Sequence, residues 1–355
     1  MAEMAKRFCQ VAAPRARLIT MRSIALTNSG MRSSVLGFGC SAMMGRVGRK
    51  ASLAALAAAC DAGITFFDTA RSYGYGESEA LLGEFLHGRR DSVLISTKFG
   101  ILPTPTTPLK RSLKPLARTL LRLAPHARKA LQQQLAAQSS PGHFSVAALH
   151  SSLETSLRAL RTDYVDFLFL HEPPASVLQQ QDLFAALEQL VTAGKIRRYG
   201  IASPPEVIEA ARTTQHLSLQ TIQLPCNLFN MNQTLSLAQQ LNPTNDTIVI
   251  ANHPFGGSAG IHATRARLTS LAASPETPTD LRKKLYPIDE ATLADVVLNA
   301  ITRDTNIQVV VPSMLHPAHL RANIAAIGHS RFTPEELHYL RTAISTQTQR
   351  ATHQA

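Results

Sequence analysis

Short apolar runs alternate with longer segments of helical periodicity through most of this chain. The apolar runs lie at residues 36–39, 64–67, 93–97, 165–170, 196–202, 219–224, 247–251 and 307–311. Helical patterns follow at 50–62, 76–87, 145–160, 180–193, 204–213, 233–240, 288–303 and 317–327. Strands this apolar, each followed by a helix, are typical of a parallel sheet buried on both faces. Eight such units predict an α/β fold, a closed (β/α)8 TIM barrel.

Elements outside the repeating units are also predicted at both ends of the chain. Residues 22–26 and 31–35 flank the turn Thr27-Asn28-Ser29-Gly30, which predicts an N-terminal β-hairpin. Near the C-terminus, Thr333 and Glu336 form a capping-box pattern. We therefore expect one extra helix outside or beneath the barrel.

Two long segments interrupt the alternation, 100–143 and 258–286. In a barrel both would be long βα loops on the C-terminal rim, where active sites are built. The first is rich in proline and basic residues, and leucines at helical spacing between 113 and 123 predict an amphipathic helix within it. We interpret this helix as a cover for the rim, with a membrane or partner contact as the alternative.

The domain organisation follows from these boundaries. We expect a single domain at 22–347, a short tail at 348–355, and a basic segment at 1–21 that is disordered or precedes a true start at Met21. A hydrophobic content of 45% is enough for a sizeable core. No apolar run approaches the roughly 18 residues that span a bilayer, so no membrane partner is expected.

Cysteine spacing and net charge narrow the function classes further. Cys9, Cys40, Cys60 and Cys226 are scattered, which favours the cytoplasm over a disulfide framework and gives no metal-site spacing. The net charge of +12 raises the question of nucleic acid. However, the chain has no Trp and few aromatics for base stacking, so no nucleic-acid partner is expected. A solvated basic surface, or attraction of an anionic cofactor, explains the charge instead.

Four ionisable residues fall at or just beyond the C-terminal ends of three successive predicted strands: Asp68, Tyr73, Lys98 and His171. A phenol has a reference pKa near 10, and a nearby ammonium lowers it. A carboxylate would hold the ammonium charged, and histidine can hydrogen-bond a carbonyl oxygen. The set therefore describes proton delivery to a carbonyl oxygen. Hydride must come from a cofactor, because no side chain supplies it.

At these positions the sequence resembles the aldo-keto reductase family, over about residues 22–327. The matching motifs are Phe67-Asp68-Thr69-Ala70 with Tyr73-Gly74 and Ser78-Glu79, then Ser96-Thr97-Lys98-Phe99-Gly100, then Tyr164-Val165-Asp166 with Leu170-His171. The resemblance implies that Tyr73 is the proton donor, that Lys98 and Asp68 tune it, and that His171 orients the carbonyl. The implied substrate is a small aldehyde, ketone or sugar lactol.

The resemblance also implies a nicotinamide cofactor, NADP with NAD possible, lying across the barrel mouth without a Rossmann fold. The implied contacts are Ser203 and Gln223 at the carboxamide, Asn252 at the nicotinamide ring, Phe255, Gly256 and Gly257 at the pyrophosphate, and Ser313, His319 and Asn323 at the adenosine end. The substrate pocket would be shaped by Met43, Met44, Phe99 and Ile101 together with the two long loops.

The sequence departs from the family pattern at several cofactor positions. Pro204 stands where the family often has Asn, and Asn252 stands where an aromatic ring commonly stacks on nicotinamide. Ser313 and His319 replace the basic pair that often marks NADP preference, so a bidentate Arg–phosphate contact is lost there.

Three alternatives stay open at this point. Lys98 could be the nucleophile of a Schiff-base lyase. The altered cofactor positions are compatible with a non-catalytic barrel that binds cofactor or regulates a partner. Asp68 and His171 could be ligands in a metal-dependent hydrolase, although Tyr73 and Lys98 would then have no role. The sequence does not set the oligomeric state.

Overall fold

The computed structural model describes residues 21–103 and 142–352, apart from 28, 46, 215, 216, 218, 242–245 and 304. The basic segment 1–20 and most of the insertion 100–143, with its expected amphipathic helix, lie outside the described residues.

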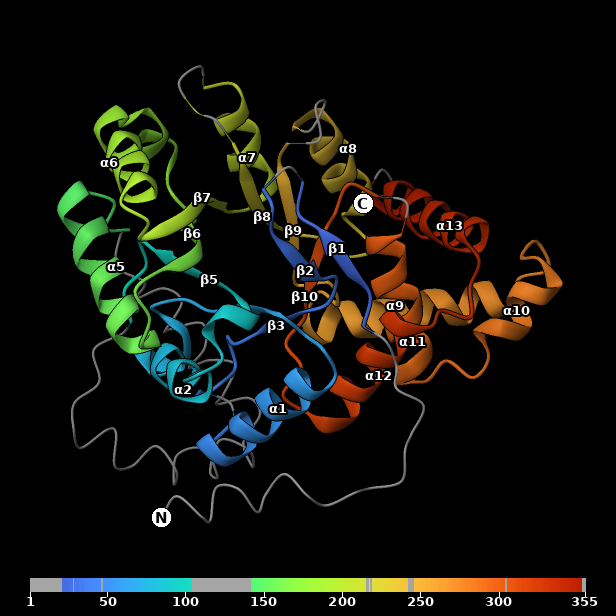
Figure 1. Ribbon diagram of the computed structural model, residues 1–355. Helices are drawn as coiled ribbons and strands as arrows, with labels where there is room; N and C mark the ends of the chain where they lie inside the picture. The colour runs from blue at the N-terminus through green and yellow to red at the C-terminus, as the bar shows by residue number, and fades with distance from the viewer. Residues whose placement is uncertain are drawn as a thin grey trace, which may run out of the picture.

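Eight parallel strands form one sheet in chain order, which confirms the predicted barrel (Figure 1). Hydrogen bonds from Val310 N to Val35 O at 2.9 Å and from Gly39 N to Pro312 O at 3.0 Å join the first strand to the last. The strands are β3 (Gly37–Gly39), β4 (Phe66–Asp68), β5 (Leu94–Phe99), β6 (Val165–His171), β7 (Ile196–Ala202), β8 (Thr221–Pro225), β9 (Ile248–Asn252) and β10 (Val309–Val311).

Helices cover the outside of the barrel in the predicted alternation (Figure 1). Ser145 caps α5 as expected, because its hydroxyl accepts a hydrogen bond from Ala148 N at 3.2 Å. The helices that follow barrel strands are α1 (Arg49–Asp61), α2 (Ser78–Phe85), α5 (Val146–Leu160), α6 (Gln181–Thr192), α7 (Pro205–Arg212), α8 (Met231–Leu241), α11 (Glu290–Thr302) and α12 (Pro317–Gly328).

The predicted hairpin is present and closes the N-terminal end of the barrel. Strands β1 (Ser23–Ala25) and β2 (Arg32–Ser34) pair antiparallel. Leu26 and Met31, at the ends of the hairpin turn, belong to one buried cluster with barrel residues that include Phe66, Leu94, Ile248 and Val309 at the starts of their strands. Active-site chemistry is therefore left to the opposite, C-terminal end of the barrel.

The segment 258–286, expected as a long loop, is mostly helical. It contains α9 (Gly257–Ala273) and α10 (Thr279–Leu285). Thr264, Leu268 and Leu271 of α9 are buried at i, i+4 and i+7, so one helical face packs against the body of the protein.

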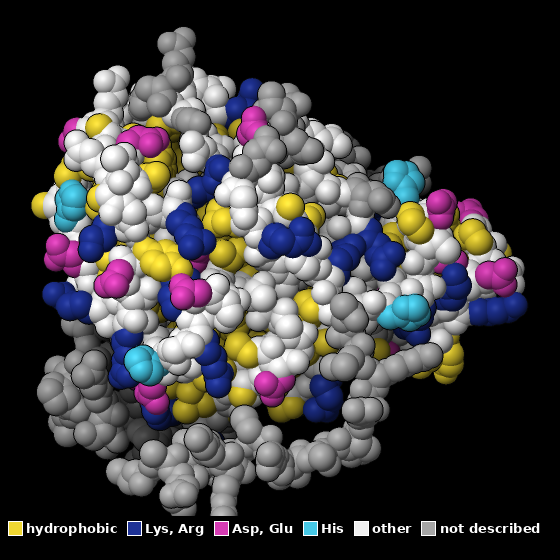
Figure 2. Space-filling view, viewed as in Figure 1, with side chains coloured by type: hydrophobic (Ala, Val, Ile, Leu, Met, Phe, Trp, Pro, Cys, Tyr) yellow, Lys and Arg dark blue, Asp and Glu magenta, His cyan; other side chains and the backbone are white. Residues whose placement is uncertain are grey.

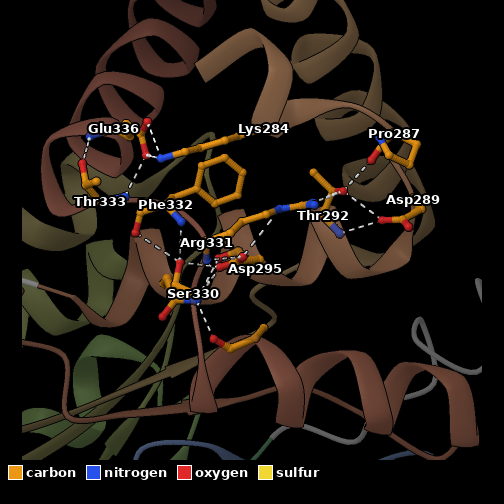
Figure 3. A network of polar contacts seen from close by, with 12 residues as sticks. Lys284, Pro287, Asp289, Thr292, Asp295, Ser330, Arg331, Phe332, Thr333 and Glu336 are labelled. Atoms are coloured by element: carbon orange, nitrogen blue, oxygen red, sulfur yellow. Dashed lines mark hydrogen bonds and ion pairs between the residues drawn. The ribbon is translucent and has the colours of Figure 1, made fainter. Parts of the chain in front are cut away.

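The final helix, α13 (Pro334–Thr352), begins at the predicted capping box and runs past the boundary expected at 347. Thr333 N donates to Glu336 Oε2 at 2.8 Å, and Glu336 N donates to Thr333 Oγ1 at 3.3 Å. Lys284 of α10 pairs with Glu336 at 2.8 Å, as Figure 3 shows. The capping box thus also ties α13 to the α9–α10 segment.

Charged side chains are spread over the face of the molecule that carries the hairpin. On this face, Figure 2 shows Lys and Arg side chains interspersed with acidic and uncharged ones. None of the helices in the described part of the chain combines the length and apolarity needed to cross a bilayer.

Candidate active site

A buried ion pair lies at the C-terminal end of the barrel. Lys98 Nζ lies 2.7 Å from Asp68 Oδ1 and 2.8 Å from Oδ2, and it donates to the Thr69 carbonyl oxygen at 3.0 Å. Lys98 is 1% exposed and Asp68 is 4% exposed. Removing two charges from water is tolerated only when their hydrogen-bonding groups are satisfied, and this ammonium has three acceptors.

Two further side chains hold Asp68 in place. Ser96 Oγ donates to Asp68 Oδ1 at 2.7 Å, and Gln223 Nε2 donates to the same oxygen at 2.8 Å. Ser96 is the register partner of Asp68 and faces the same side of β5 as Lys98. The sequence reasoning missed Ser96, although the two-residue alternation from Lys98 could have found it.

Tyr73 and His171 are partly exposed next to this buried pair. Tyr73 begins the short helix η2 (Tyr73–Gly76), and His171 ends β6. Their ring centroids are 6.1 Å apart in an edge-on arrangement, and Lys98 Nζ lies 4.8 Å from the centroid of the Tyr73 ring. The structure thus brings together all four residues predicted to be catalytic, with the phenol and the imidazole nearest the solvent.

The backbone after Tyr73 explains why glycine follows it. Gly74 has a φ of 60°, in the left-handed region that favours glycine. A Cβ atom at Gly74 would lie 2.4 Å from the carbonyl oxygen of Met43. The loop that carries the phenol therefore packs directly on the β3–α1 connection, which fixes the position of Tyr73.

The surroundings shift the pKa values of Tyr73, Lys98 and His171. Burial raises the pKa of Tyr73, and the positive charge of Lys98 only partly offsets this effect. The net direction is thus opposite to the lowering expected from Lys98 alone. Burial by itself would lower the pKa of Lys98, but the charge of Asp68 and hydrogen bonds outweigh it and raise that pKa. Burial and the charge of Lys98 lower the pKa of His171 to about 3.

These directions describe a neutral phenol, a charged ammonium and a neutral imidazole near neutral pH. A charged ammonium has no lone pair for attack on a carbonyl. The geometry therefore disfavours the Schiff-base alternative for Lys98.

Four buried polar atoms in or just after the adjoining strands β7, β8 and β9 have no hydrogen-bond partner in the described part of the chain. Thr221 Oγ1 lies at the start of β8. The other three lie nearer the mouth: Ser203 Oγ follows β7, Gln223 Oε1 lies midway along β8 and Asn252 Oδ1 ends β9. Buried polar atoms are normally satisfied, so a group of orphaned ones at a barrel mouth points to a polar ligand. A carboxamide, which has both N–H donors and a carbonyl acceptor, fits these atoms.

The predicted pyrophosphate segment lies at the start of α9. Gly256 and Gly257 are exposed and have φ angles of 62° and 68°. Gly256 N already donates to the His253 carbonyl oxygen at 2.9 Å, but the N–H groups of the first turn of α9 and the positive end of its helix dipole suit an anionic group. Phe255 is partly buried and packs against the core. Asn227, missed from the sequence, is close by, with its amide nitrogen 3.6 Å from where a Gly256 Cβ would lie.

The residues predicted at the adenosine end lie on and before α12. Ser313 and His319 are exposed, whereas Asn323 is buried. His319 Nε2 lies 3.3 Å from Glu290 Oε1. The sequence did not predict the contact with Glu290. Its carboxylate adds negative charge at the position where a cation would bind the 2′-phosphate of NADP.

The residues predicted to shape the substrate pocket divide into two groups. Met43 and Phe99 are fully buried in the layer between barrel and helices, where Phe99 packs on Phe144 at a centroid distance of 5.7 Å. Because side chains alternate along a strand, Phe99 faces outward when Lys98 faces inward. Phe99 therefore points away from the barrel interior, and Met43 is buried in the same core cluster, whereas Met44 and Ile101 are partly exposed.

The fold and this group of residues define a (β/α)8 barrel with a buried Lys–Asp pair beneath a Tyr and a His. The family described as "Aldo/keto reductase family" matches residues 35–345, so the chain belongs to the aldo-keto reductase family.

Individual relatives agree with this assignment. Aldo-keto reductase YhdN of Bacillus subtilis is 31% identical over 216 residues, which cover 59% of this chain and 55% of the relative. Aldo-keto reductase yakc [NADP(+)] of Schizosaccharomyces pombe is 26% identical over 258 residues, covering 70% of this chain and 64% of the relative. Each match thus spans less than two thirds of the relative's length.

A solved structure supports the fold. The holo form of an aldo-keto reductase from Bacillus halodurans superposes with a TM-score of 0.61 at 21% identity, covering 91% of this chain and 96% of that one.

Proposed function

We propose that this protein is a nicotinamide-dependent oxidoreductase that interconverts a carbonyl compound, such as an aldehyde, a ketone or a sugar lactol, and its alcohol. The observation that carries the proposal is the buried Lys98–Asp68 pair beside the neutral side chains of Tyr73 and His171. Membership of the aldo-keto reductase family supports it.

Each of the four residues has a distinct role in the proposed reaction. Tyr73 donates its phenolic proton to the carbonyl oxygen of the substrate. Lys98 stabilises the phenolate that forms, because an adjacent cation favours the charged phenol. Asp68 holds Lys98 charged and oriented. The neutral imidazole of His171 positions the carbonyl oxygen by donating a hydrogen bond.

The nicotinamide cofactor supplies the hydride when it is bound. Ser203, Gln223 and Asn252 would hold its carboxamide end, since each has a buried polar atom without a hydrogen-bond partner among the described residues. The first turn of α9, which begins at Gly257 and follows Gly256, would hold its phosphates.

For the cofactor itself we propose NADP, with NAD as the alternative. The NADP(+) in the name of the fission yeast relative supports NADP. Glu290 beside His319 favours NAD, because a carboxylate repels a 2′-phosphate. We also propose a small-molecule substrate and a cytoplasmic location, which suits the NADPH pool and the free thiols of Cys40, Cys60 and Cys226.

A fluorescence titration with NADPH and with NADH, followed by a broad panel of carbonyl substrates, tests the proposal. We expect saturable binding of at least one cofactor and its oxidation by some carbonyl compounds. Binding without any turnover would favour a non-catalytic cofactor-binding barrel. Neither binding nor turnover would refute the proposed function.

A further inference from the structure

A second buried carboxylate lies behind the four proposed catalytic residues. Glu79 of α2 is 2% exposed. Its Oε1 accepts a hydrogen bond from Thr97 Oγ1 at 2.6 Å. Its Oε2 has no hydrogen-bond partner in the described part of the chain, and Arg71 NH1 lies 3.7 Å from it. The Nε of Arg71 is likewise buried without a hydrogen-bond partner among the described residues.

The two contacts of Glu79 lead to the two segments that carry the proton donor and its cation. Arg71 lies in the loop between Asp68 and Tyr73, two residues before the phenol. Thr97 precedes Lys98 on β5. Because side chains alternate along a strand, Lys98 faces Asp68 inside the barrel while Thr97 faces α2 on the outside. Glu79 therefore connects the Tyr73 loop to the Lys98 strand from behind.

Close packing of α2 on α5 prevents this carboxylate from reaching water. A Cβ atom at Gly83, one turn after Glu79, would lie 2.4 Å from the backbone of Leu160. Ser156 lies one turn before Leu160 on α5, and its hydroxyl acts to lower the pKa of the Glu79 carboxyl. Burial raises the pKa of Glu79, and Arg71 is the one charged group that opposes this effect, the others being the hydroxyls of Thr97 and Ser156.

We propose that Glu79 is a positioning residue for the reaction, holding Arg71 and Thr97 so that the phenol of Tyr73 stays next to the ammonium of Lys98. This inference rests on the proposed function, because it concerns the rate of proton transfer from Tyr73. Displacements of about 1 Å in a catalytic group can cost 100-fold in rate, so the effect on turnover should be large.

Glu79→Gln is the direct test, because the amide keeps an acceptor for Thr97 and removes the charge that faces Arg71. We expect kcat to fall by about 10- to 100-fold, with the KM for the carbonyl substrate and the Kd for NADPH unchanged. The alkaline limb of the kcat–pH profile, which reports Tyr73, should shift. Arg71→Met should reproduce these changes, and the double variant should be no slower than either single one, because both act through one contact.

Asp295→Asn is the matched control. Asp295 on α11 is also buried, at 6% exposed, and Arg331 Nε lies 3.8 Å from its Oδ2. Figure 3 shows it among Ser330 and Arg331, which belong to a network around α11 and α13. This variant should lower the midpoint of thermal unfolding and leave kcat unchanged well below that midpoint.

The outcomes separate this inference from the function on which it rests. A wild-type protein that binds no cofactor and reduces no carbonyl refutes the proposed function and this inference with it. An active wild type with an equally active Glu79→Gln refutes the positioning role alone. An equal loss of kcat in Asp295→Asn also refutes the positioning role of Glu79, because a general loss of stability would then explain the lower kcat. If Glu79→Gln does not fold, Arg71→Met decides by the same kcat and pH readouts.

Discussion

The two sides of the barrel mouth differ in how completely their polar atoms are paired. On the β4–β5 side, Asp68 and Lys98 are buried. The Asp68 carboxylate accepts hydrogen bonds from Ser96 Oγ and Lys98 Nζ, so the two charges are paired within the protein. On the β7–β9 side, Ser203 and Asn252 present buried oxygens without partners in the described residues. Gln223 belongs to both sides, since its amide nitrogen donates to Asp68 and its oxygen has no partner among the described residues.

The difference follows from the cost of burying charge compared with that of burying a neutral dipole. An unpaired buried charge is strongly destabilising, so the ion pair must be complete in the folded protein. An unpaired neutral oxygen costs only about 1–3 kcal/mol, which a ligand recovers when it binds. The catalytic side is therefore organised in advance, whereas the proposed cofactor side is completed by the cofactor.

The largest expected effect comes from removing one partner of the Lys98–Asp68 ion pair. Lys98→Met leaves the carboxylate of Asp68 buried without a cation, so we expect the free energy of unfolding to fall by about 3–5 kcal/mol. Carbonyl reduction should be lost as well. Urea unfolding and a turnover assay measure the two effects. In the double variant Lys98→Met/Asp68→Asn, much of the stability should return without the activity; a double variant as unstable as the single one would contradict the assigned ion pair.

His171 makes the stability of the same side depend on pH. Its pKa is lowered to about 3 in the folded protein, against about 6.5 in an unfolded chain. Below pH 6.5 the unfolded chain takes up a proton that the folded protein does not, so stability falls with decreasing pH, by up to about 1.4 kcal/mol per pH unit.

His171→Asn removes this titration. Urea unfolding of both proteins between about pH 7 and pH 5 should therefore show a smaller loss of stability in the variant. Parallel pH profiles for the two proteins would show that His171 takes up its proton normally in the folded state.

A matched pair of serines gives the smallest and most selective comparison. Ser203→Ala should weaken NADPH binding by about 0.5–1.5 kcal/mol without destabilising the cofactor-free protein, because its hydroxyl has no partner to lose among the described residues. Ser96→Ala should lower the free energy of unfolding and leave NADPH binding unchanged, since the Ser96 hydroxyl donates to Asp68. Fluorescence titration measures NADPH binding and urea unfolding measures stability in both variants. Equal effects of the two substitutions would contradict the proposed difference between the two sides of the mouth.

Much of the fold and the central chemistry was predictable from the sequence. Parallel strands in a barrel bring their C-terminal ends to one rim, so Asp68, Lys98 and His171 could be placed together from their positions after apolar runs. The cap at Ser145 and the capping box at Thr333 are local, which is why the sequence pattern suffices for them.

Other features depend on contacts between distant segments. The sequence does not show that Glu79 meets Arg71 and Thr97, or that Glu290 faces His319. The net direction of the Tyr73 pKa depends on how deeply the ring is buried, which no motif encodes. The outward orientation of Phe99 was accessible in principle, since it follows from the inward orientation of Lys98.

The most direct test of the account compares NADPH oxidation by the wild-type protein and by Tyr73→Phe with one carbonyl substrate under single-turnover conditions. The substitution removes one oxygen and should leave the fold and cofactor binding intact. We predict that the rate of hydride transfer falls by about 100- to 10,000-fold, as for loss of a general acid. An unchanged rate in Tyr73→Phe would contradict the assignment of Tyr73 as the proton donor.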